Sequence, residues 1–363
     1  MAADTIPARL FRRAEQMPGR PAYHAKRDGS WVASSWGEYA DLVRRAGKAL
    51  IALGVQPDQV TTILGFNRPE WVVFDVATMA IGGAPAGIYT TNSPEEVEYI
   101  TGHAEAPVIL VENEEQLAKV LEVRDRLPRL RTIVTMEGTP AHDDESIFTW
   151  EAFLALADDV DDADFTARLE GLKPEGLATL IYTSGTTGPP KGVMLTHENL
   201  TWTSDAARGI VEIEPEDRGI SYLPLSHIAE QMFTIHIPIT RGGQVHYAES
   251  IDDLAENIKE VRPTYFFAVP RVWEKFHAGV ATELGKASGV KAKIADWAQN
   301  VGRTVAHLRN EGSSPTGLLK LQHGLAGKLV HGKLQEALGF DEVKFLASGA
   351  APISAEVLEF FAG

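Results

Sequence analysis

The sequence predicts an α/β protein with two β-α subdomains, each built on a sheet that helices cover. Short apolar runs of strand length alternate with amphipathic segments of helix length between residues 60 and 135, as in parallel sheets. A similar alternation resumes near residue 177 and reaches a last strand at 343–347. The chain has 363 residues, of which 44% are hydrophobic, so it should hold two domains or one large composite domain, with enough apolar material for a continuous core.

We expect the first subdomain to span residues 1–140. Ser35 and Glu38 have capping-box spacing at the start of its first long helix, and Pro69 and Pro94 suit the first turns of two others. The expected strands are 60–64, 84–88, 108–111 and 132–135, and the expected helices are 36–53, 69–81, 94–104 and 114–122.

Residues 141–170 are expected to form an acidic connector. The stretch 141–167 contains nine acidic residues and neither Lys nor Arg, which indicates a solvated segment. Its large apolar residues suffice for one short helix; they are Phe148, Trp150, Phe153 and Leu154. The second subdomain is then expected to span 171–363. Its clearest elements are strands at 177–182, 192–196 and 343–347 and a helix at 355–361.

Composition excludes several classes of protein. The chain carries 34 Lys and Arg against 50 Asp and Glu, a net charge of -16, which disfavours nucleic acid as a partner. It has no cysteine, and no apolar run approaches the ~18 residues of a membrane span. Residues 1–13 lack the apolar core of a signal peptide. We expect a cytoplasmic protein, with peripheral contact to the inner face of a membrane and self-association as open questions.

The sharpest signal is the loop 183–192, which lies between two apolar strands. Its glycines allow close approach of the backbone, and its N–H groups, hydroxyls and lysine all favour an anion such as phosphate. The predicted phosphate-binding residues are Thr183, Ser184, Gly185, Thr186, Thr187, Gly188 and Lys191. A flexible linker is the alternative, but a linker needs neither flanking strands nor a lysine. The loop is no Walker motif, because Gly192 follows the lysine and no helix is expected there.

Together with Tyr182, this loop resembles the phosphate loop of the adenylate-forming superfamily of acyl-CoA synthetases, luciferases and peptide-synthetase adenylation domains. The segments 222–231 and 348–354 resemble further motifs of that superfamily, in the same order and at similar spacing. The segment 269–275 is similar to long-chain fatty acyl-CoA synthetases of the bubblegum type. The resemblance covers essentially the whole chain and implies the N-terminal domain fold of these enzymes.

The resemblance implies ATP, Mg²⁺ and coenzyme A as ligands and a fatty acid as substrate. A carboxylate that attacks ATP approaches another anion, and two charges about 4 Å apart repel by about 1 kcal/mol even in water, so cations are required. Lys191 and Mg²⁺ would supply them, with Thr183 as the hydroxyl on the metal side. By resemblance, His227 lies near the acyl carboxylate and the thiol path, and Gln231 stands where some relatives have a gating tryptophan. The resemblance also implies that adenine is contacted by Ser348, Gly349, Ala350, Ala351 and Pro352. It implies that Val269 and Pro270 form part of the wall of the acyl pocket.

Several of these residues have simpler interpretations. A lone histidine beside apolar residues is more often part of the core, so His227 has that alternative. Glu230 could form half of a metal-binding pair with it, but a surface or hydrogen-bonding role is the stronger hypothesis. The segment 348–352 could be an ordinary strand-to-helix turn in which Pro352 starts the helix. Likewise, 269–276 could simply be a strand that leads into a buried helix.

The end of the chain departs from the superfamily pattern. An aromatic-Gly-x-Thr-Glu motif, a ribose-binding Asp and a small C-terminal domain with a catalytic lysine would follow in relatives, and none is present. We therefore expect a truncated N-terminal part of a longer protein. Two functions stay open: a long-chain fatty acid–CoA ligase or other acyl or aryl adenylate-forming enzyme, and an inactive nucleotide- or acyl-binding fragment.

The region 271–344 reverses the charge of the chain, with eleven basic and seven acidic residues. One apolar stripe at helical spacing consists of Val290, Ile294, Trp297, Val301, Val305 and Leu308, and 318–330 adds a second apolar segment. Such a stripe is usually core, but the positive charge nearby also favours contact with an anionic membrane surface.

Overall fold

The structure, a computed structural model, describes residues 3–183, 188–209, 212–286 and 288–362. The chain divides into two compact units, Met1–Ile251 and Asp252–Gly363, and each is described by itself. The predicted boundaries at residues 140 and 170 do not coincide with this division.

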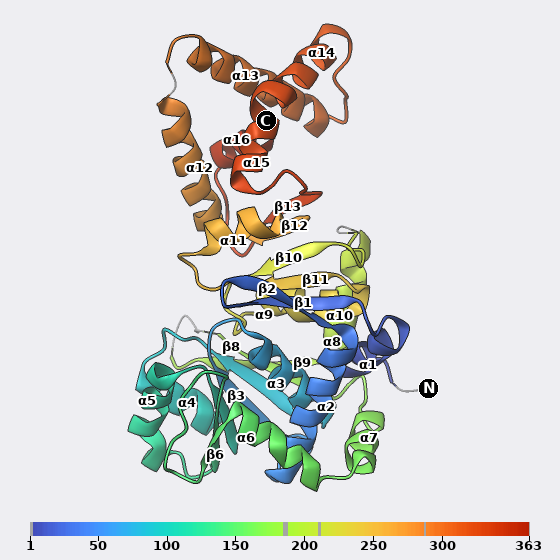
Figure 1. The fold of residues 1–363 in the computed structure, drawn as a ribbon, viewed down its shortest axis with the longest axis vertical. Helices are drawn as coiled ribbons and strands as arrows, with labels where there is room; N and C mark the ends of the chain where they lie inside the picture. Colours follow the sequence, from blue (N-terminus) through green and yellow to red (C-terminus); the bar gives the residue numbers. More distant parts are fainter. Residues whose placement is uncertain (1–2, 184–187, 210–211, 287, 363) are drawn as a thin grey trace. The chain divides into compact units, whose positions relative to one another are not determined.

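The first unit contains a seven-stranded sheet in the order β7-β6-β5-β3-β4-β8-β9. Its strands β3, β6, β8 and β9 are labelled in Figure 1. All neighbouring strands are parallel except β8 and β9, which form an antiparallel hairpin. The strands are β3 (Val60–Leu64), β4 (Ala84–Ile88), β5 (Val108–Val111), β6 (Thr132–Thr135), β7 (Ile147–Thr149), β8 (Leu177–Thr183) and β9 (Lys191–Thr196).

Helices cover both faces of this sheet. Successive side chains of a strand point to opposite faces, and both sets are buried. Val108 and Leu110 of β5 belong to one core cluster, while Ile109 and Val111 belong to another. The first cluster contains α1 (Ile6–Gln16), α2 (Trp36–Ala52), α3 (Pro69–Ala80), α6 (Trp150–Ala155) and α7 (Asp162–Glu170). The second contains α4 (Pro94–His103) and α5 (Glu114–Val123). The expected parallel, helix-covered sheet is thus confirmed.

Local start signals explain where the helices begin. Ser35 and Glu38 form a complete capping box on α2, and Ser93 and Glu96 form another on α4. Pro69 and Pro94 occupy the first turns of α3 and α4, as the sequence predicts.

A second, four-stranded sheet of the first unit has the order β10-β11-β1-β2. Its strands are β1 (Pro21–Arg27), β2 (Ser30–Ser35), β10 (Arg218–Ser221) and β11 (Gln244–Tyr247). The helices α8 (His197–Ala206), α9 (Ile228–Gln231) and α10 (Ile237–Arg241) complete the unit, with a π-helix at Met232–His236. Tyr23 and Val245 of this sheet belong to the same core cluster as α2 and α3, so one continuous core joins the two sheets.

The acidic stretch 141–170 is not a solvated connector between domains. It supplies β7 to the edge of the seven-stranded sheet and two short helices, of which α6 is the one expected. Phe153 and Phe165 are completely buried in the core. The acidic side chains lie on the exposed outer face of this segment. Phe153 and Phe165 on its inner face pack in the core.

The second unit contains a two-stranded parallel sheet of β12 (Tyr265–Ala268) and β13 (Phe345–Ser348). Phe266, Trp273 and Phe340 form its aromatic core, with ring centroids 5.2–6.2 Å apart. The helices are α11 (Leu254–Val261), α12 (Pro270–Gly285), α13 (Val290–Asn310), α14 (Gly317–Ala326), α15 (Gly332–Leu338) and α16 (Ala355–Ala362), with a π-helix at Gly327–His331.

Two expectations about this unit need correction. Pro352 does not start the final helix, which begins at Ala355 after Ser354, whose hydroxyl accepts a hydrogen bond from the Val357 N–H (3.3 Å). The apolar stripe of α13 is divided: Val301 and Val305 are buried, whereas Val290 and Ile294 are exposed. Across the described ranges, no helix combines the length and the apolar character needed to cross a membrane.

Candidate functional site

The predicted phosphate loop connects the two strands of the β8–β9 hairpin. Thr183 and Lys191 are paired across its open end, and both side chains are exposed. Gly188 has a φ of +108°, a conformation that glycine adopts without strain. The predicted ligands Ser184, Gly185, Thr186 and Thr187 lie outside the described residues. The hairpin therefore brings the predicted lysine and the predicted metal-side hydroxyl together at the mouth of the loop.

Helix α4 supports this hairpin from one side. The Tyr99 hydroxyl donates a hydrogen bond to the Pro190 carbonyl (3.0 Å), and His103 Nδ1 lies 2.9 Å from the Tyr182 hydroxyl. Burial raises the pKa of Tyr182 to about 12, so its hydroxyl keeps its proton at neutral pH. Sequence analysis did not single out Tyr99 or His103, because their roles depend on contacts with residues 91 and 79 positions further on.

The turn that precedes α9 lies directly over the seven-stranded sheet. A Cβ built on Gly87 of β4 would come 2.7 Å from Ser226 Cα and 3.1 Å from the Trp71 ring, so only glycine fits there without a shift. Strand β4 is the immediate neighbour of β8. The turn that carries His227 is therefore held above the strand next to the phosphate-loop hairpin.

His227 is exposed, which excludes the interpretation of a core histidine. It is the N-cap of α9, and its Nδ1 accepts a hydrogen bond from the Ala229 N–H (3.1 Å). In the neutral ring the proton consequently resides on Nε2. The predicted orienting histidine thus has a fixed tautomer and a ring N–H available as a donor.

Glu230 lies beneath this turn as a buried hydrogen-bonding carboxylate. Its Oε1 accepts bonds from the Tyr222 N–H (3.1 Å), the Thr234 hydroxyl (2.9 Å) and Asn67 Nδ2 (3.3 Å). Burial raises its pKa to about 7, although the hydrogen bonds from Thr234 and Tyr222 oppose the shift. The hydrogen-bonding role is confirmed and the surface position is wrong, because Glu230 is only 3% exposed.

Asn67 is the residue of this network that the sequence did not reveal. It follows β3, and its Nδ2 also donates to Ser221 Oγ and to the Leu223 carbonyl, both at 2.8 Å. Its position could have identified it as a candidate site residue, because residues that follow buried parallel strands face ligand crevices in α/β folds. Asn67 ties the end of β3 to the end of β10 and the turn before His227.

Gln231, a predicted substrate-binding residue that stands where some relatives have a gating tryptophan, is completely buried. Its Nε2 donates to the Leu225 carbonyl at 2.9 Å, which holds the turn closed from inside. A direct contact with substrate stays a prediction.

In the second unit, the predicted acyl and adenine segments leave the same edge of one small sheet. Ala268 and Ser348 are paired at the carboxyl ends of the parallel strands β12 and β13, so Val269 and Pro270 emerge beside Gly349. Trp273 Nε1 donates to the Ala347 carbonyl (3.1 Å) and ties the start of α12 to β13. The carboxyl edge of parallel strands is the usual place for ligands in such folds.

Three details of the 348–352 segment suit a ligand contact. The Ser348 hydroxyl is buried and finds no hydrogen-bond partner among the described residues. A Cβ on Gly349 would come 2.9 Å from the Phe267 ring. Ala350 has a φ of +67°, a strained conformation for a residue with a side chain, of the kind that concentrates at functional sites. Ala351 and Pro352 follow without regular structure before α16.

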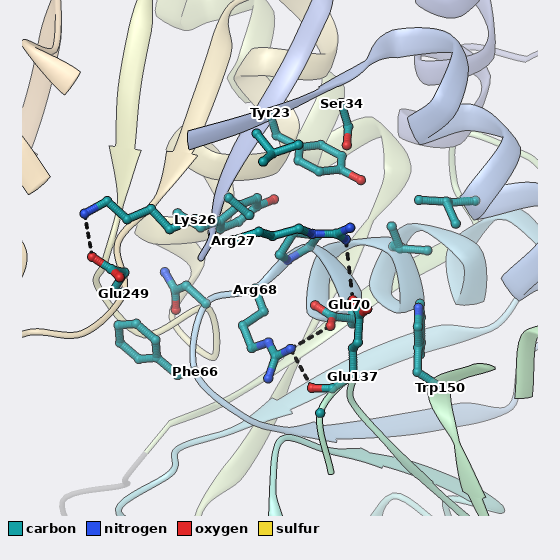
Figure 2. Close-up of a pocket in the computed structure, with 18 of the residues that line it drawn as sticks. Tyr23, Lys26, Arg27, Ser34, Phe66, Arg68, Glu70, Glu137, Trp150 and Glu249 are labelled. Carbon is teal, nitrogen blue, oxygen red and sulfur yellow. Dashed lines mark hydrogen bonds and ion pairs between the residues drawn. The ribbon is translucent and has the colours of Figure 1, made fainter. Parts of the chain in front are cut away.

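A cavity of about 740 Å³ in the first unit was not predicted from the sequence (Figure 2). It lies in the first unit where β3, β5 and β6 end, with Phe66, Glu112 and Glu137 as lining residues from those ends. The β1–β2 hairpin contributes Lys26 and Arg27.

The charges of this cavity are largely paired with one another. Figure 2 shows Lys26 directed to Glu249 (2.8 Å), and Arg68 bound to Glu70 (2.8 Å) and to the Glu137 carbonyl (2.8 Å). Because these groups satisfy each other, the cavity does not identify a ligand by charge. Asn67 also lines it, so the cavity adjoins the network beneath His227.

Solved structures identify the fold as that of acyl-CoA synthetase N-terminal domains. The N-terminal domain of FACL13 from Mycobacterium tuberculosis superimposes with a TM-score of 0.66, covers all of this chain and 73% of that domain, and is 18% identical. A fatty acyl CoA synthetase of the same organism has a TM-score of 0.62 over 75% of this chain and 50% of its own, at 20% identity.

The chain belongs to the family described as AMP-binding enzyme, which matches residues 10–363. It is 40% identical to the long-chain-fatty-acid–CoA ligase ACSBG2 of Xenopus laevis over 94% of this chain and 46% of that protein. Human ACSBG2 and human ACSBG1 are 36% and 37% identical, over 98% and 93% of this chain and 54% and 47% of their own lengths. The family that the motifs indicated is confirmed, and the chain spans about half the length of these curated relatives.

Proposed function

We propose that this chain is the ATP- and acyl-binding part of a long-chain fatty acid–CoA ligase. The observation that carries the proposal is the pairing of Lys191 with Thr183 at the mouth of a glycine-rich hairpin loop. In a chain of net charge -16, an exposed lysine at this point gives a polyphosphate a local cation. The names of the relatives support the choice of substrate.

In the proposed first step, a carboxylate oxygen of the fatty acid attacks the α-phosphorus of ATP. A new P–O bond forms, the bond to the bridging oxygen breaks, and pyrophosphate leaves with its electron pair. Lys191 offsets the charge that gathers on the phosphates, while the loop N–H groups and hydroxyls hold the β- and γ-phosphates. The product is an acyl-adenylate.

Mg²⁺ fits this proposal as the second cation. Magnesium keeps several waters and binds mainly through substrate phosphates, so one hydroxyl such as that of Thr183 suffices from the protein. Within the described part of the chain, no three His, Asp or Glu side chains gather as a metal site of their own. When bound, the ion neutralises part of the phosphate charge.

In the proposed second step, the sulfur of coenzyme A attacks the acyl carbonyl carbon. The C–O bond to AMP breaks, AMP leaves, and the thiol proton passes to solvent. The Nε2–H of His227 is suited to hold a carbonyl or carboxylate oxygen, because Nδ1 is already engaged by the Ala229 N–H. His227 therefore orients the acyl group and need not act as a base.

The substrate and the reaction are tested by the release of pyrophosphate from ATP. The rate of pyrophosphate release is compared between palmitate, acetate and benzoate as substrates. The comparison uses this chain and any longer form that its gene encodes. We expect palmitate to be preferred, since each buried methylene contributes about 0.8 kcal/mol. Preference for acetate or benzoate would instead support another acyl- or aryl-activating enzyme. ATP binding without acid-dependent release in every form would support the inactive fragment.

We also propose that the protein works in the cytoplasm, next to the inner face of a membrane that supplies the poorly soluble acid. The basic balance of 271–344 supports this location. Self-association is a separate proposal, which light scattering of the purified chain tests.

A further inference from the structure

Helix α14 and the π-helix that follows it expose a row of leucines to solvent. Leu318, Leu321, Leu325 and Leu329 are 70%, 72%, 51% and 43% exposed. They recur at steps of three, four and four residues, which places them along one side of the helix. We call these four residues the α14 leucine face.

This face is additional to the one that packs against the protein. Leu319, Ala326 and Val330 pack with Trp297 and Val301 of α13. The ring of His331 contacts the Ala298 carbonyl at 3.1 Å and fastens the same side. The helix is therefore already anchored, so its exposed leucines are not needed to hold it in place.

The charged residues of the segment that carries the leucine face are all positive. Residues 312–335 contain three lysines and no acidic residue, in a chain whose net charge is -16. Lys320, Lys328 and Lys333 are all exposed. Exposed leucines with lysines on the same helix are the pattern of segments that lie in the interface of an anionic bilayer.

Charge also argues against a second copy of this chain as the occupant. A two-fold symmetric contact places the same patch of both copies face to face, so the lysines of one copy would meet those of the other. Anionic lipid headgroups would pair with these lysines while the acyl region receives the leucines. An anionic bilayer therefore accounts for both the exposed leucines and the lysines near them.

We propose that the α14 leucine face inserts into the surface of an anionic bilayer, with Lys320 and Lys328 at the headgroups. This surface lies in the second apolar segment that the sequence suggested, 318–330, and not on the α13 stripe, whose central valines are buried. The inference rests on the proposed membrane location and not on the ligase reaction. Vesicle binding tests it without ATP or fatty acid, so the two proposals fail separately.

The test is co-sedimentation of the chain with vesicles of equal parts phosphatidylcholine and phosphatidylglycerol, and with pure phosphatidylcholine vesicles. We expect binding to the anionic vesicles that weakens as salt is raised. The double variant Leu321→Gln/Leu325→Gln should lower the ratio of bound to free protein by about tenfold or more, because two apolar side chains lose their burial in lipid. Lys320→Glu/Lys328→Glu should remove the preference for anionic lipid.

The matched control is Leu121→Gln/Leu358→Gln, which changes two exposed leucines outside the face. It should bind vesicles like the unchanged protein, and circular dichroism melting checks that every variant folds. The proposal is wrong if the unchanged chain does not sediment with anionic vesicles, or if both double leucine variants lose binding equally. It is also wrong if Leu321→Gln/Leu325→Gln converts a dimer to a monomer, since a second copy would then be the occupant.

Discussion

Asn67 Nδ2 lies 3.3 Å from Glu230 Oε1 in the interior of the first unit, and both side chains are buried. The two residues are 163 positions apart in the chain. Through them the end of β3, the end of β10 and the turn before His227 are held as one piece. A buried carboxylate is thus part of the support for the candidate site, and its protonation state has consequences for stability.

The first prediction concerns this carboxylate. Its pKa is about 7 in the folded protein against a reference value of 4.5, so the folded state binds the extra proton between these values. The stability that Glu230 contributes is therefore complete below about pH 4.5 and is lost as pH rises through 7. The loss is on the order of 3 kcal/mol, since one pKa unit corresponds to about 1.4 kcal/mol.

Glu230→Gln isolates this effect, because glutamine keeps the acceptor oxygen and cannot ionise. Urea unfolding of both proteins at several pH values gives the difference in free energy of unfolding. We expect the unchanged protein to lose stability relative to Glu230→Gln as pH rises from about 5 to about 8. A difference that stays constant over this range would mean that Glu230 is already ionised at low pH.

The second prediction concerns the contact between β4 and the turn before His227. Gly87→Ala places a methyl group 2.7 Å from Ser226 Cα, so the turn must move. We expect a loss of about 1–3 kcal/mol in thermal unfolding, as for other overpacked sites. Gly19→Ala is the control, because a Cβ there meets nothing within 4 Å. Equal effects of the two substitutions would show that the contact is not tight.

The third prediction concerns sensitivity to acid. Burial, with a smaller contribution from His197, lowers the pKa of His236 to about 3, and neither ring nitrogen has a hydrogen-bond partner among the described residues. The unfolded chain takes up a proton near pH 6.5 and the folded chain does not, so stability falls as pH drops below 6.5.

His236→Leu should reduce this sensitivity by up to about 1.4 kcal/mol per pH unit below the unfolded pKa, because leucine has no proton to gain. His307→Leu, at an exposed position of α13, should leave the slope unchanged. The slopes come from urea unfolding at several acidic pH values. An unaltered slope for His236→Leu would assign the acid sensitivity to other groups.

Much of the fold was predictable because its signals are local. Ser35 with Glu38 and the prolines at 69 and 94 mark helix starts through contacts within one turn. The continuous apolar run 108–111 predicts a strand that is buried on both faces. In the structure its side chains lie in two different core clusters. The two strands that flank the loop were expected, but their antiparallel pairing, with Thr183 opposite Lys191, was not predicted.

The remainder depended on partners far away in the chain. Acidic residues around Phe153 and Phe165 suggested a solvated connector, because sequence counts charges without showing which face they occupy. In the sequence, Glu230 is only a polar residue close to His227. Its burial and its hydrogen bonds with Asn67 and Tyr222 appear only in the folded structure. Leu325 and Ala326 are adjacent on α14, yet one is 51% exposed and the other is completely buried.

The fourth prediction tests the central claim that the β8–β9 hairpin binds the phosphates of ATP. Lys191→Ala removes the exposed cation at the mouth of the loop and leaves the backbone pairing with Thr183 intact. Lys173→Ala is the matched control, since Lys173 is an exposed lysine shortly before β8. Both variants should keep the thermal stability of the unchanged chain.

The most direct measurement is calorimetric titration of ATP with Mg²⁺ into the unchanged chain and these two variants. The unchanged chain should bind, and Lys191→Ala should weaken binding by more than about tenfold, or about 1.4 kcal/mol. Lys173→Ala should bind like the unchanged chain. No binding by the unchanged chain, or equal binding by all three proteins, would contradict the assignment of this hairpin as the ATP site.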